Sequence, residues 1–360
     1  MKVALLGISH PHAAPLLTTL ENLPEITQVH LWDSDPAVVA KPTLPASRKA
    51  TTPTTDLDSI LRQKDVDFAI VCVRHDQAPA ISHRVIAAGK HLMAEKPVGM
   101  TSAEITGLQL AANRAGVATS VLYTRRLHPC MVAARKISQS GALGRLLTVE
   151  CRFLTTQVRF RKPEHWLFQK RYSGGGILLW LGCHCLDLMY HVTGDEIVEL
   201  GAALVTRSGE KIDVDDAAML TLKFKSGAVG TFHAGYTMAY SGEGYVNNSG
   251  YDSYMGFNGT TGRIVWPDLD PRLVIESPPA PGRPAHREEK YEMAPSTSYG
   301  GTTGEDFFRL FFAAMRKEGP SPTTLQDAVR TARIIEAAAE SSESGKFVKV
   351  KVDSSFPPNG

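Results

Sequence analysis

The sequence is poor in the features that mark secreted, membrane-spanning or nucleic-acid-binding chains. Its five cysteines are scattered over 360 residues and form no disulfide framework, which favours a reducing compartment. No apolar run is long enough to cross a bilayer, and the apolar start at residues 3–7 is too short for a signal peptide. The net charge of +2 and the lack of a basic tract give no support for a nucleic-acid partner. We therefore expect a cytoplasmic protein with neither a membrane nor a nucleic-acid partner.

Metal-ligand spacing is missing as well. Cys183 and Cys185 flank His184, but residues two apart on a helix point to different sides. No second cysteine pair has the spacing of a zinc site. No bound metal is predicted.

The N-terminal part of the chain alternates between strand and helix patterns. The helical patterns include residues 77–88 and a segment that starts at Thr101 with capping-box spacing. The strand-like apolar runs are residues 2–7, 26–32, 68–73, 91–94 and 117–122. Apolar runs of this kind are typical of strands buried on both faces. The alternation predicts an α/β Rossmann domain with a doubly wound parallel sheet over residues 1–123.

The pattern changes from about residue 146 onward. Longer runs now alternate apolar with polar residues, and a hairpin turn is expected at residues 225–227. The alternating runs are residues 146–153, 217–224 and 228–234. Helices are expected at residues 177–191, 305–317 and 323–343, and a surface loop at residues 278–301. Residues 124–360 are therefore predicted to form an α+β domain with a large, open, mainly antiparallel sheet.

The turn after the first strand is the expected place for a dinucleotide pyrophosphate. It reads Gly7-Ile8-Ser9-His10-Pro11-His12, so only the first glycine of a G-x-G-x-x-G pattern is present. Ser9 is small enough for close approach of a phosphate, and Pro11 fits a first helical turn. Gly7, Ser9 and His10 are the predicted cofactor contacts in this turn.

Asp33 ends the second predicted strand, where a carboxylate can bind the ribose hydroxyls and repel a 2′-phosphate. The alternative is that Asp33 only caps a turn with the residues that follow it. Together with the surrounding sheet, the cofactor interpretation is favoured. NAD is expected rather than NADP, because Ser34 and Asp35 supply no arginine for an extra phosphate.

Taken together, these residues resemble the Gfo/Idh/MocA family of glucose–fructose oxidoreductases and inositol dehydrogenases over nearly the whole chain. The stretches that carry the resemblance are residues 88–91, Glu95-Lys96-Pro97, Arg125-Arg126, residues 140–145, Gly174-Gly175-Gly176, Gly182, His184, Asp187 and residues 256–262. The combination is specific, although each stretch alone is not.

The resemblance implies a nicotinamide cofactor, a sugar or cyclitol substrate, and homodimers or homotetramers formed through the open sheet. It also implies a cis peptide bond before Pro97 that directs Lys96. Val73, His75, Glu95 and Lys96 are the further cofactor contacts that it implies.

The chain departs from the family pattern in three places. The glycine-rich turn is depleted, and residues 73–78 differ from the family's Thr-Pro-Asn loop, so the contacts on the nicotinamide side must differ. Trp180 stands where the family carries an aspartate, four residues before His184.

Lys96 and His184 are the predicted catalytic residues. Oxidation of a secondary alcohol needs a base for the hydroxyl proton and positive charge where the alkoxide develops. His184 suits the first task because its ordinary pKa is near 6.5, and Lys96 suits the second at the carboxyl edge of the sheet. The alternatives are a core histidine and a solvated lysine at a strand end. Asp187 is expected to brace His184 or a backbone amide, and His191 to be structural.

Substrate contacts are predicted around these two residues. Trp180 is either an aromatic platform for a sugar ring or a core residue, and the two interpretations stay open. Arg125 either faces the cleft or joins a structural salt bridge. The other candidates are Tyr123, His128, His165, Trp166, Tyr236 and Tyr240.

The main functional hypothesis is an NAD(P)-dependent oxidoreductase that acts on a sugar, cyclitol or related polyol. A second hypothesis keeps the fold and cofactor but cleaves a glycosidic bond by transient oxidation and elimination, and the missing aspartate motivates it. A third is a non-enzymatic dinucleotide sensor. Lys96 and His184 argue against the third.

Overall fold

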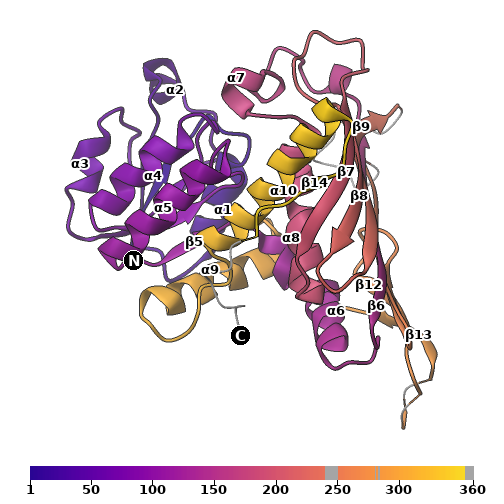
Figure 1. Ribbon diagram of the computed structural model, residues 1–360. Helices are drawn as coiled ribbons and strands as arrows, with labels where there is room; N and C mark the ends of the chain where they lie inside the picture. The colour runs from indigo at the N-terminus through magenta and orange to yellow at the C-terminus, as the bar shows by residue number, and fades with distance from the viewer. Residues whose placement is uncertain (240–249, 280, 283, 353–360) are drawn as a thin grey trace. The chain divides into compact units, whose positions relative to one another are not determined.

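The computed structural model describes residues 1–239, 250–279, 281–282 and 284–352 (Figure 1). These residues divide into two compact units, each formed by two segments of the chain. The N-terminal unit comprises Met1–Leu127 and Ala294–Val329, and the C-terminal unit comprises His128–Met293 and Arg330–Gly360. The predicted domains, residues 1–123 and 124–360, did not include the return of Ala294–Val329 to the N-terminal unit.

The N-terminal unit contains the predicted parallel sheet, with strand order β2-β1-β3-β4-β5. Its strands are β1 (Lys2–Leu6), β2 (Gln28–Trp32), β3 (Val66–Val71), β4 (His91–Ala94) and β5 (Thr119–Val121). Every described pair in this sheet is parallel. The central strands are buried almost throughout, which explains their continuous apolar runs. The order and the crossovers confirm the doubly wound α/β fold.

Helices pack around this sheet. They are α1 (Ala13–Asn22), α2 (Pro36–Ala40), α3 (Leu57–Leu61), α4 (Ala78–Ala87), α5 (Ser102–Ala115) and α9 (Gly301–Met315), with the 3₁₀ turn η1 (Thr124–Leu127) after β5. The predicted capping box is present at α5, where Thr101 and Glu104 each accept from the other's backbone amide. Phe311 and Phe312 of α9 pack against Phe68 of β3, with ring centroids 5.6 and 5.7 Å away. This aromatic packing ties the returning segment to the N-terminal core.

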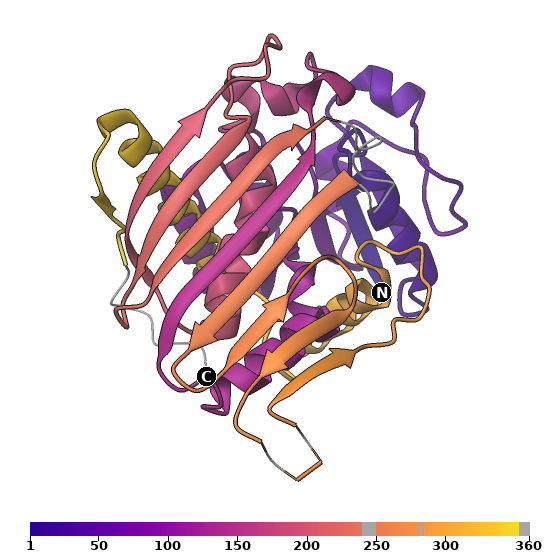
Figure 2. The same ribbon diagram turned by 90° about the vertical axis from the view of Figure 1, so that its right-hand side faces the viewer.

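The C-terminal unit is built on a large mixed sheet with strand order β13-β12-β11-β10-β6-β9-β8-β7-β14 (Figure 2). Its strands are β6 (Leu146–Thr156), β7 (Ile197–Val205), β8 (Ala217–Phe224), β9 (Val229–Met238), β10 (Tyr251–Gly259), β11 (Arg263–Trp266), β12 (Arg272–Glu276), β13 (His286–Lys290) and β14 (Val348–Lys349). The β6–β9 pair is parallel and the other described pairs are antiparallel. The prediction of a mainly antiparallel sheet is confirmed. The predicted loop at residues 278–301 is wrong in part, because β13 lies inside it.

One face of this sheet is covered and the other is open. Residues of β8 alternate between buried and exposed from Ala218 to Phe224, as expected for a strand with one solvated face. The covered face packs against α6 (Pro129–Gln139), α8 (Cys183–Thr193) and α10 (Leu325–Ser344), and Figure 2 shows the other face uncovered. Short elements connect the strands and helices: η2 (Val158–Phe160), η3 (Trp166–Phe168) and α7 (Lys170–Ser173).

Two further findings concern the whole described chain. All five cysteines lie in the described part of the chain, where they are buried and form no disulfide. Among the described residues, no helix combines the length and the apolar composition needed to span a membrane.

Candidate active site

Gly7 fixes the turn between β1 and α1. Its φ is +102°, and a Cβ at this position would lie 2.1 Å from the backbone oxygen of Cys72. The amide of Gly7 donates to the carbonyl of Trp32 at 2.8 Å. Only glycine fits this conformation and this close approach, so the one retained glycine of the motif has a steric reason.

Asp33 links the end of β2 to this turn. Its Oδ2 accepts from the amide and the hydroxyl of Ser9 at 2.9 and 2.8 Å. Its Oδ1 accepts from the amide of Asp35 at 3.1 Å, so Asp33 also caps the turn that follows it, as the alternative interpretation predicts. Because the Ser9 hydroxyl donates to Asp33, a phosphate contact by Ser9 requires that this bond be exchanged. Oδ1 accepts one hydrogen bond and keeps a further lone pair for a ribose hydroxyl, whereas Oδ2 already accepts two.

His10 is turned into the interior of the N-terminal unit. Its Nδ1 lies 3.1 Å from the Cys72 sulfur and accepts from the amide of His12 at 3.1 Å. Burial raises the pKa of the Cys72 thiol well above its ordinary value, and the charge of Glu95 adds to this effect. Val73 and His75, which follow Cys72 closely in the sequence, are also buried. The predicted contact of His10 with a cofactor therefore needs a rearrangement of this side chain.

Glu95 and Lys96 follow β4 at the carboxyl end of the sheet. Lys96 is fully buried, and its Nζ lies 3.9 Å from Oε1 of Glu95. The same Oε1 lies 2.9 Å from Nδ1 of His12. Oε2 of Glu95 is buried and has no hydrogen-bond partner in the described part of the chain. The Lys96–Pro97 peptide bond is cis, as the resemblance implies.

Tyr123 and Arg125 lie after β5 in the same unit. Tyr123 is buried and Arg125 lies in η1. The neighbouring Arg126 forms a buried ion pair with Asp327 at 2.9 Å. Arg126 therefore has a structural salt bridge, and the substrate role of Arg125 stays a prediction.

His184 lies near the start of α8 in the C-terminal unit. The preceding residues Leu178–Gly182 form a π-helical turn, η4, so the predicted helix at residues 177–191 is two helical types in succession. Such π-helical turns are frequent at functional sites. His184 and Asp187 are both buried.

Asp215 holds the beginning of this helical segment. Its Oδ1 accepts from the amide of Gly176 at 2.8 Å, and its Oδ2 accepts from the amide of Leu178 at 3.1 Å. The amide of Ile177 donates to its backbone oxygen at 2.9 Å. Burial raises the pKa of Asp215, against the opposing effect of the two amide bonds. Three hydrogen bonds to one residue thus fix the start of the segment that carries His184.

Trp180 lies in the hydrophobic core of the C-terminal unit and is 2% exposed. Its ring meets the ring of Trp166 edge-to-face, with centroids 6.5 Å apart. Trp166 is half-buried and packs on His165, with centroids 5.4 Å apart. The surroundings of Trp180 therefore agree with its interpretation as a core residue. Of the two tryptophans, Trp166 has the more accessible ring.

The other candidates make contacts of their own. His128 packs on Trp266 with ring centroids 4.6 Å apart, and Tyr236 packs on Phe168 at 5.6 Å. The backbone oxygen of His191 accepts from Arg135 at 2.6 Å. Tyr240 lies outside the described residues.

The predicted site residues thus fall on both units. Gly7, Ser9, Asp33, Glu95 and Lys96 gather at the carboxyl end of the N-terminal sheet. The C-terminal unit carries Trp166, Trp180 and His184. His12, which contacts Glu95, and Asp215 were not predicted from the sequence. For Asp215, an acidic pair directly before a strand and a run of three glycines were the available signals.

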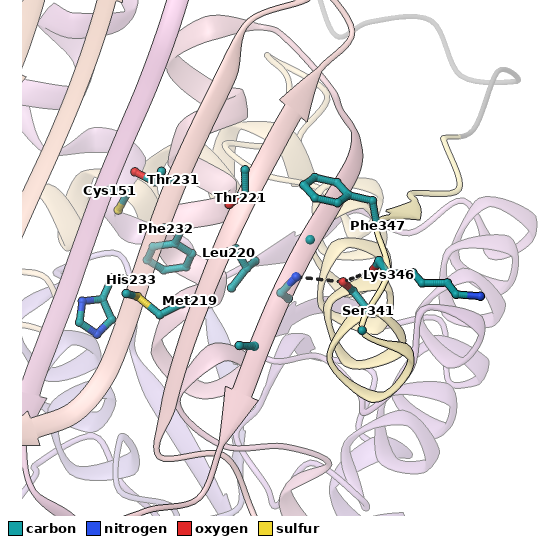
Figure 3. Close-up of a pocket in the computed structure, with 14 residues that line it drawn as sticks. Cys151, Met219, Leu220, Thr221, Thr231, Phe232, His233, Ser341, Lys346 and Phe347 are labelled. Atoms are coloured by element: carbon teal, nitrogen blue, oxygen red, sulfur yellow. Dashed lines mark hydrogen bonds between the residues drawn. The ribbon is translucent and has the colours of Figure 1, made fainter.

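Among the described residues, no group of three or more histidine, cysteine, aspartate or glutamate side chains could hold a metal ion. A cavity of about 560 Å³ lies on the C-terminal sheet between β7, β8, β9 and the residues before β14 (Figure 3). Figure 3 shows Phe347 at one side of it and Thr221 and Met219 on the strands. This cavity contains none of the predicted site residues.

Two family models match the chain. One, described as an oxidoreductase family with an NAD-binding Rossmann fold, matches residues 1–123. The other, described as a GFO/IDH/MocA C-terminal domain, matches residues 131–265.

Curated relatives are distant. Levoglucosan dehydrogenase of Pseudarthrobacter phenanthrenivorans is 27% identical over 59% of this chain, and the chain spans 58% of that protein's length. The 1,5-anhydro-D-fructose reductase of Ensifer adhaerens is 23% identical over 82% of this chain and 84% of its own. Trans-1,2-dihydrobenzene-1,2-diol dehydrogenase of Bos taurus is 26% identical over 63% of this chain and 65% of its own.

Solved structures share the fold. The complex of levoglucosan dehydrogenase with NADH and levoglucosan has a TM-score of 0.83 at 22% identity, over 97% of this chain and 99% of that chain. An oxidoreductase domain protein from Kribbella flavida has the same TM-score of 0.83 at 22% identity, over 97% of this chain and 99% of that chain. At this identity the likeness establishes the architecture alone.

Proposed function

Because the chain belongs to the Gfo/Idh/MocA family of oxidoreductases with an NAD-binding Rossmann fold, we propose that it is an NAD-dependent dehydrogenase of a sugar, cyclitol or related polyol. The observation that carries the proposal is the buried Lys96 ammonium after β4, where ligands of doubly wound sheets bind. The similarity to a levoglucosan dehydrogenase and an anhydrofructose reductase supports the substrate class.

The N-terminal unit fits a dinucleotide. The position of Gly7 has no room for a side chain, and Asp33 is held at the end of β2 with one lone pair of Oδ1 unused. The buried Oε2 of Glu95 has no hydrogen-bond partner among the described residues, as expected of an acceptor that binds a donor group of a ligand. NAD bound here supplies a hydride acceptor. Gly7, Asp33 and Glu95 are the residues that would hold it.

The chain's own residues then carry the proton and the charge. In the proposal, His184 accepts the hydroxyl proton of the substrate at its imidazole, and Lys96 stabilises the developing alkoxide. The proposal requires that these residues, one from each unit, act on the same substrate. Trp166 offers an aromatic face for the apolar side of a sugar ring.

A panel of sugars, anhydrosugars and inositols, followed by NADH absorbance, tests this function. Stoichiometric NADH from one or more members is the expected result. Release of an aglycone from a glycoside without net NADH would instead favour the elimination mechanism, for which the replacement of the family's aspartate by Trp180 is the motivating observation. Binding of NAD without any turnover would leave the sensor hypothesis.

NAD is the proposed cofactor, because Asp33 would repel a 2′-phosphate. We expect Asp33→Ser to lower the preference for NAD over NADP by at least about tenfold in kcat/KM, since the repulsive charge is removed. Ser9→Ala is the matched control, because it removes one hydrogen bond to Asp33 but keeps the carboxylate. An unchanged preference in Asp33→Ser, or an equal change in Ser9→Ala, would contradict the role of the charge.

We also propose that copies of the chain associate through the open face of the C-terminal sheet, as a homodimer or homotetramer in the cytoplasm. Exposed apolar side chains support this: Met219 on β8 is 56% exposed, Val229 lies on β9 and Phe347 precedes β14. The lack of disulfides among the five cysteines is compatible with the proposed compartment.

The association can be tested by a charge on this face. Met219→Glu is expected to shift the protein toward monomer in light scattering after size-exclusion chromatography, because a carboxylate would be buried unpaired in the interface. Leu110→Glu is the control, since Leu110 on α5 is similarly exposed at 49% but lies in the other unit. A wild-type monomer, or the same shift in both variants, would refute the proposed interface.

A further inference from the structure

The stretch between β6 and η4, which carries Trp166, consists of short helical turns. It contains η2 and η3, of three residues each, and α7, of four. η3 begins at Trp166 and ends at Phe168, whose buried ring packs edge-to-face on Tyr236. Helical turns this short are not stable by themselves in water. The placement of Trp166 therefore depends on contacts with other parts of the C-terminal unit.

Asp213, in the loop between β7 and β8, makes two hydrogen bonds to this stretch. Its amide donates to the carbonyl of Phe168 at 3.3 Å, and its Oδ1 accepts from the amide of Lys170 at 2.5 Å. These two backbone groups lie on either side of Gln169, which has an extended conformation. A residue of a parallel strand pair bonds its neighbour in a similar way, but here a carboxylate oxygen takes the place of a carbonyl. The second bond therefore depends on the side chain of Asp213.

The amide of Lys170 needs this acceptor. It is the first amide of α7, and the first amides of a helix have no acceptor within the helix itself. Gln169 lies at the N-cap position, but its side chain donates to the carbonyl of Glu164 at 2.9 Å and does not cap α7 within the described structure. Asp213 supplies the acceptor instead, from 43 positions further along the chain. The start of α7 is thus fixed by a residue outside the stretch.

Neighbouring carboxylates of the same loop hold other parts of the unit. Asp215 fixes the start of the segment that carries His184. Oδ2 of Asp216 accepts from two amides of its own loop, at 2.8 and 2.6 Å. The contacts of Asp213 are with the stretch that carries Trp166. The loop therefore supports both groups that the proposed function uses in this unit, through different residues.

We propose that Asp213 is a positioning residue that sets Trp166 for the substrate, as Asp215 sets His184. Asp213 acts through the backbone of the η3–α7 stretch and not by a contact with the substrate. The inference rests on the proposed function for its effect on the sugar, because Trp166 is there the aromatic face for the ring. Its expected signature is a change in the KM for the sugar without a matching change in kcat.

Two variants isolate the bond to the Lys170 amide. Asp213→Ala removes the acceptor, and Asp213→Asn keeps an acceptor oxygen at nearly the same place. We expect Asp213→Ala to raise the KM for the sugar about 3- to 10-fold, the effect of losing one hydrogen bond, because a smaller fraction of the protein then holds the stretch in place. kcat should change by less than about twofold, since His184 is held by another residue. Asp213→Asn should restore the KM.

Glu210→Ala is the matched control. Glu210 belongs to the same loop, and its carboxylate forms no hydrogen bond or ion pair within the described part of the chain. The variant therefore removes an equal charge from this loop without removing a bond to the η3–α7 stretch. Its KM for the sugar should stay at the wild-type value.

Limited digestion of the full-length protein by trypsin gives a readout that is independent of turnover. Lys170 and Arg171 are exposed, and cleavage after them requires local opening of the stretch. Asp213→Ala should be cleaved there several-fold faster than wild type, Asp213→Asn and Glu210→Ala, as followed by peptide mass spectrometry. Cleavage after Arg207, whose amide is bonded to Asp216, is the internal reference and should not change.

The two measurements separate this inference from the proposed function. If wild type oxidises no polyol, the proposed function fails, but the digestion still decides whether Asp213 holds the stretch. Equal cleavage of wild type and Asp213→Ala, or failure of Asp213→Asn to restore slow cleavage, would overturn the inference. In an active enzyme, an unchanged KM for the sugar in Asp213→Ala, or the same rise in Glu210→Ala, would overturn it as well.

Discussion

Replacing Lys96 by methionine is expected to lower kcat by about 10²- to 10³-fold, the usual effect of removing one donor aimed at a developing oxyanion. Methionine keeps most of the length of the side chain and is apolar enough for the buried site, so the loss mainly reports removal of the ammonium. His184→Ala should lower kcat by about 10²- to 10⁴-fold through loss of the base. Because both residues act on one hydroxyl group in the proposal, the double variant should lose less than the product of the two effects. Steady-state kinetics measure kcat of the single and double variants, and calorimetry measures whether each variant still binds NAD.

Lys90 is a matched control for Lys96. It is also a buried lysine, it directly precedes β4 rather than following it, and its Nζ donates to the backbone oxygen of Gln63. Lys90→Met should therefore cost stability but leave the kcat of the folded protein close to wild type. The proposed function would be wrong if Lys96→Met kept near-normal turnover, or if Lys90→Met lost as much while still binding NAD.

Strands with strong burial patterns could be predicted from the sequence, and weakly patterned ones could not. The strand at residues 91–94 was predicted to the residue because it is a short apolar run between turn signals. By contrast, β13 reads His-Arg-Glu-Glu-Lys and has no apolar residue, because it is an edge strand paired on one side only with β12. β13 is a strand because it pairs with β12, and the sequence of residues 286–290 by itself does not indicate this pairing.

The site shows the same division. Lys96 and Asp33 could be found because the carboxyl ends of parallel strands are where ligands bind, and strand ends are visible in the sequence. The contact between His12 and Glu95 joins residues 83 positions apart, and the one between Asp215 and Gly176 joins residues 39 apart. Neither has a local pattern. Trp180 stayed open for another reason, since a leucine-rich helix gives the same periodicity for a core residue and for a platform.

Substitution of Gly176 is expected to have the largest effect on the free energy of unfolding. Gly176→Ala should lower the free energy of unfolding by more than about 4 kcal/mol, which is the range of severe backbone or packing conflicts. A Cβ on Gly176 would lie 1.8 Å from the backbone oxygen of Asp215 and 2.7 Å from its backbone carbon and nitrogen. Because these are backbone atoms, no change of rotamer relieves the contact.

To make room for the methyl group, Asp215 must withdraw, and the hydrogen bonds that it accepts from Gly176, Ile177 and Leu178 would be broken or lengthened. These bonds fix the start of the segment that delivers His184, so turnover of any folded fraction should fall as well. Gly175→Ala is the adjacent control, because the nearest atoms to its Cβ would be side-chain atoms, those of Leu179 at 3.3 and 3.5 Å and Oδ1 of Asp215 at an ordinary contact distance of 3.9 Å. We expect it to change the unfolding free energy by less than about 1 kcal/mol. Urea denaturation of the two variants, with kcat measured where a folded fraction remains, compares them directly. If Gly176→Ala and Gly175→Ala were similarly stable, the hydrogen bonds to Asp215 would not fix the start of this helical segment. The position of His184 would then need another explanation.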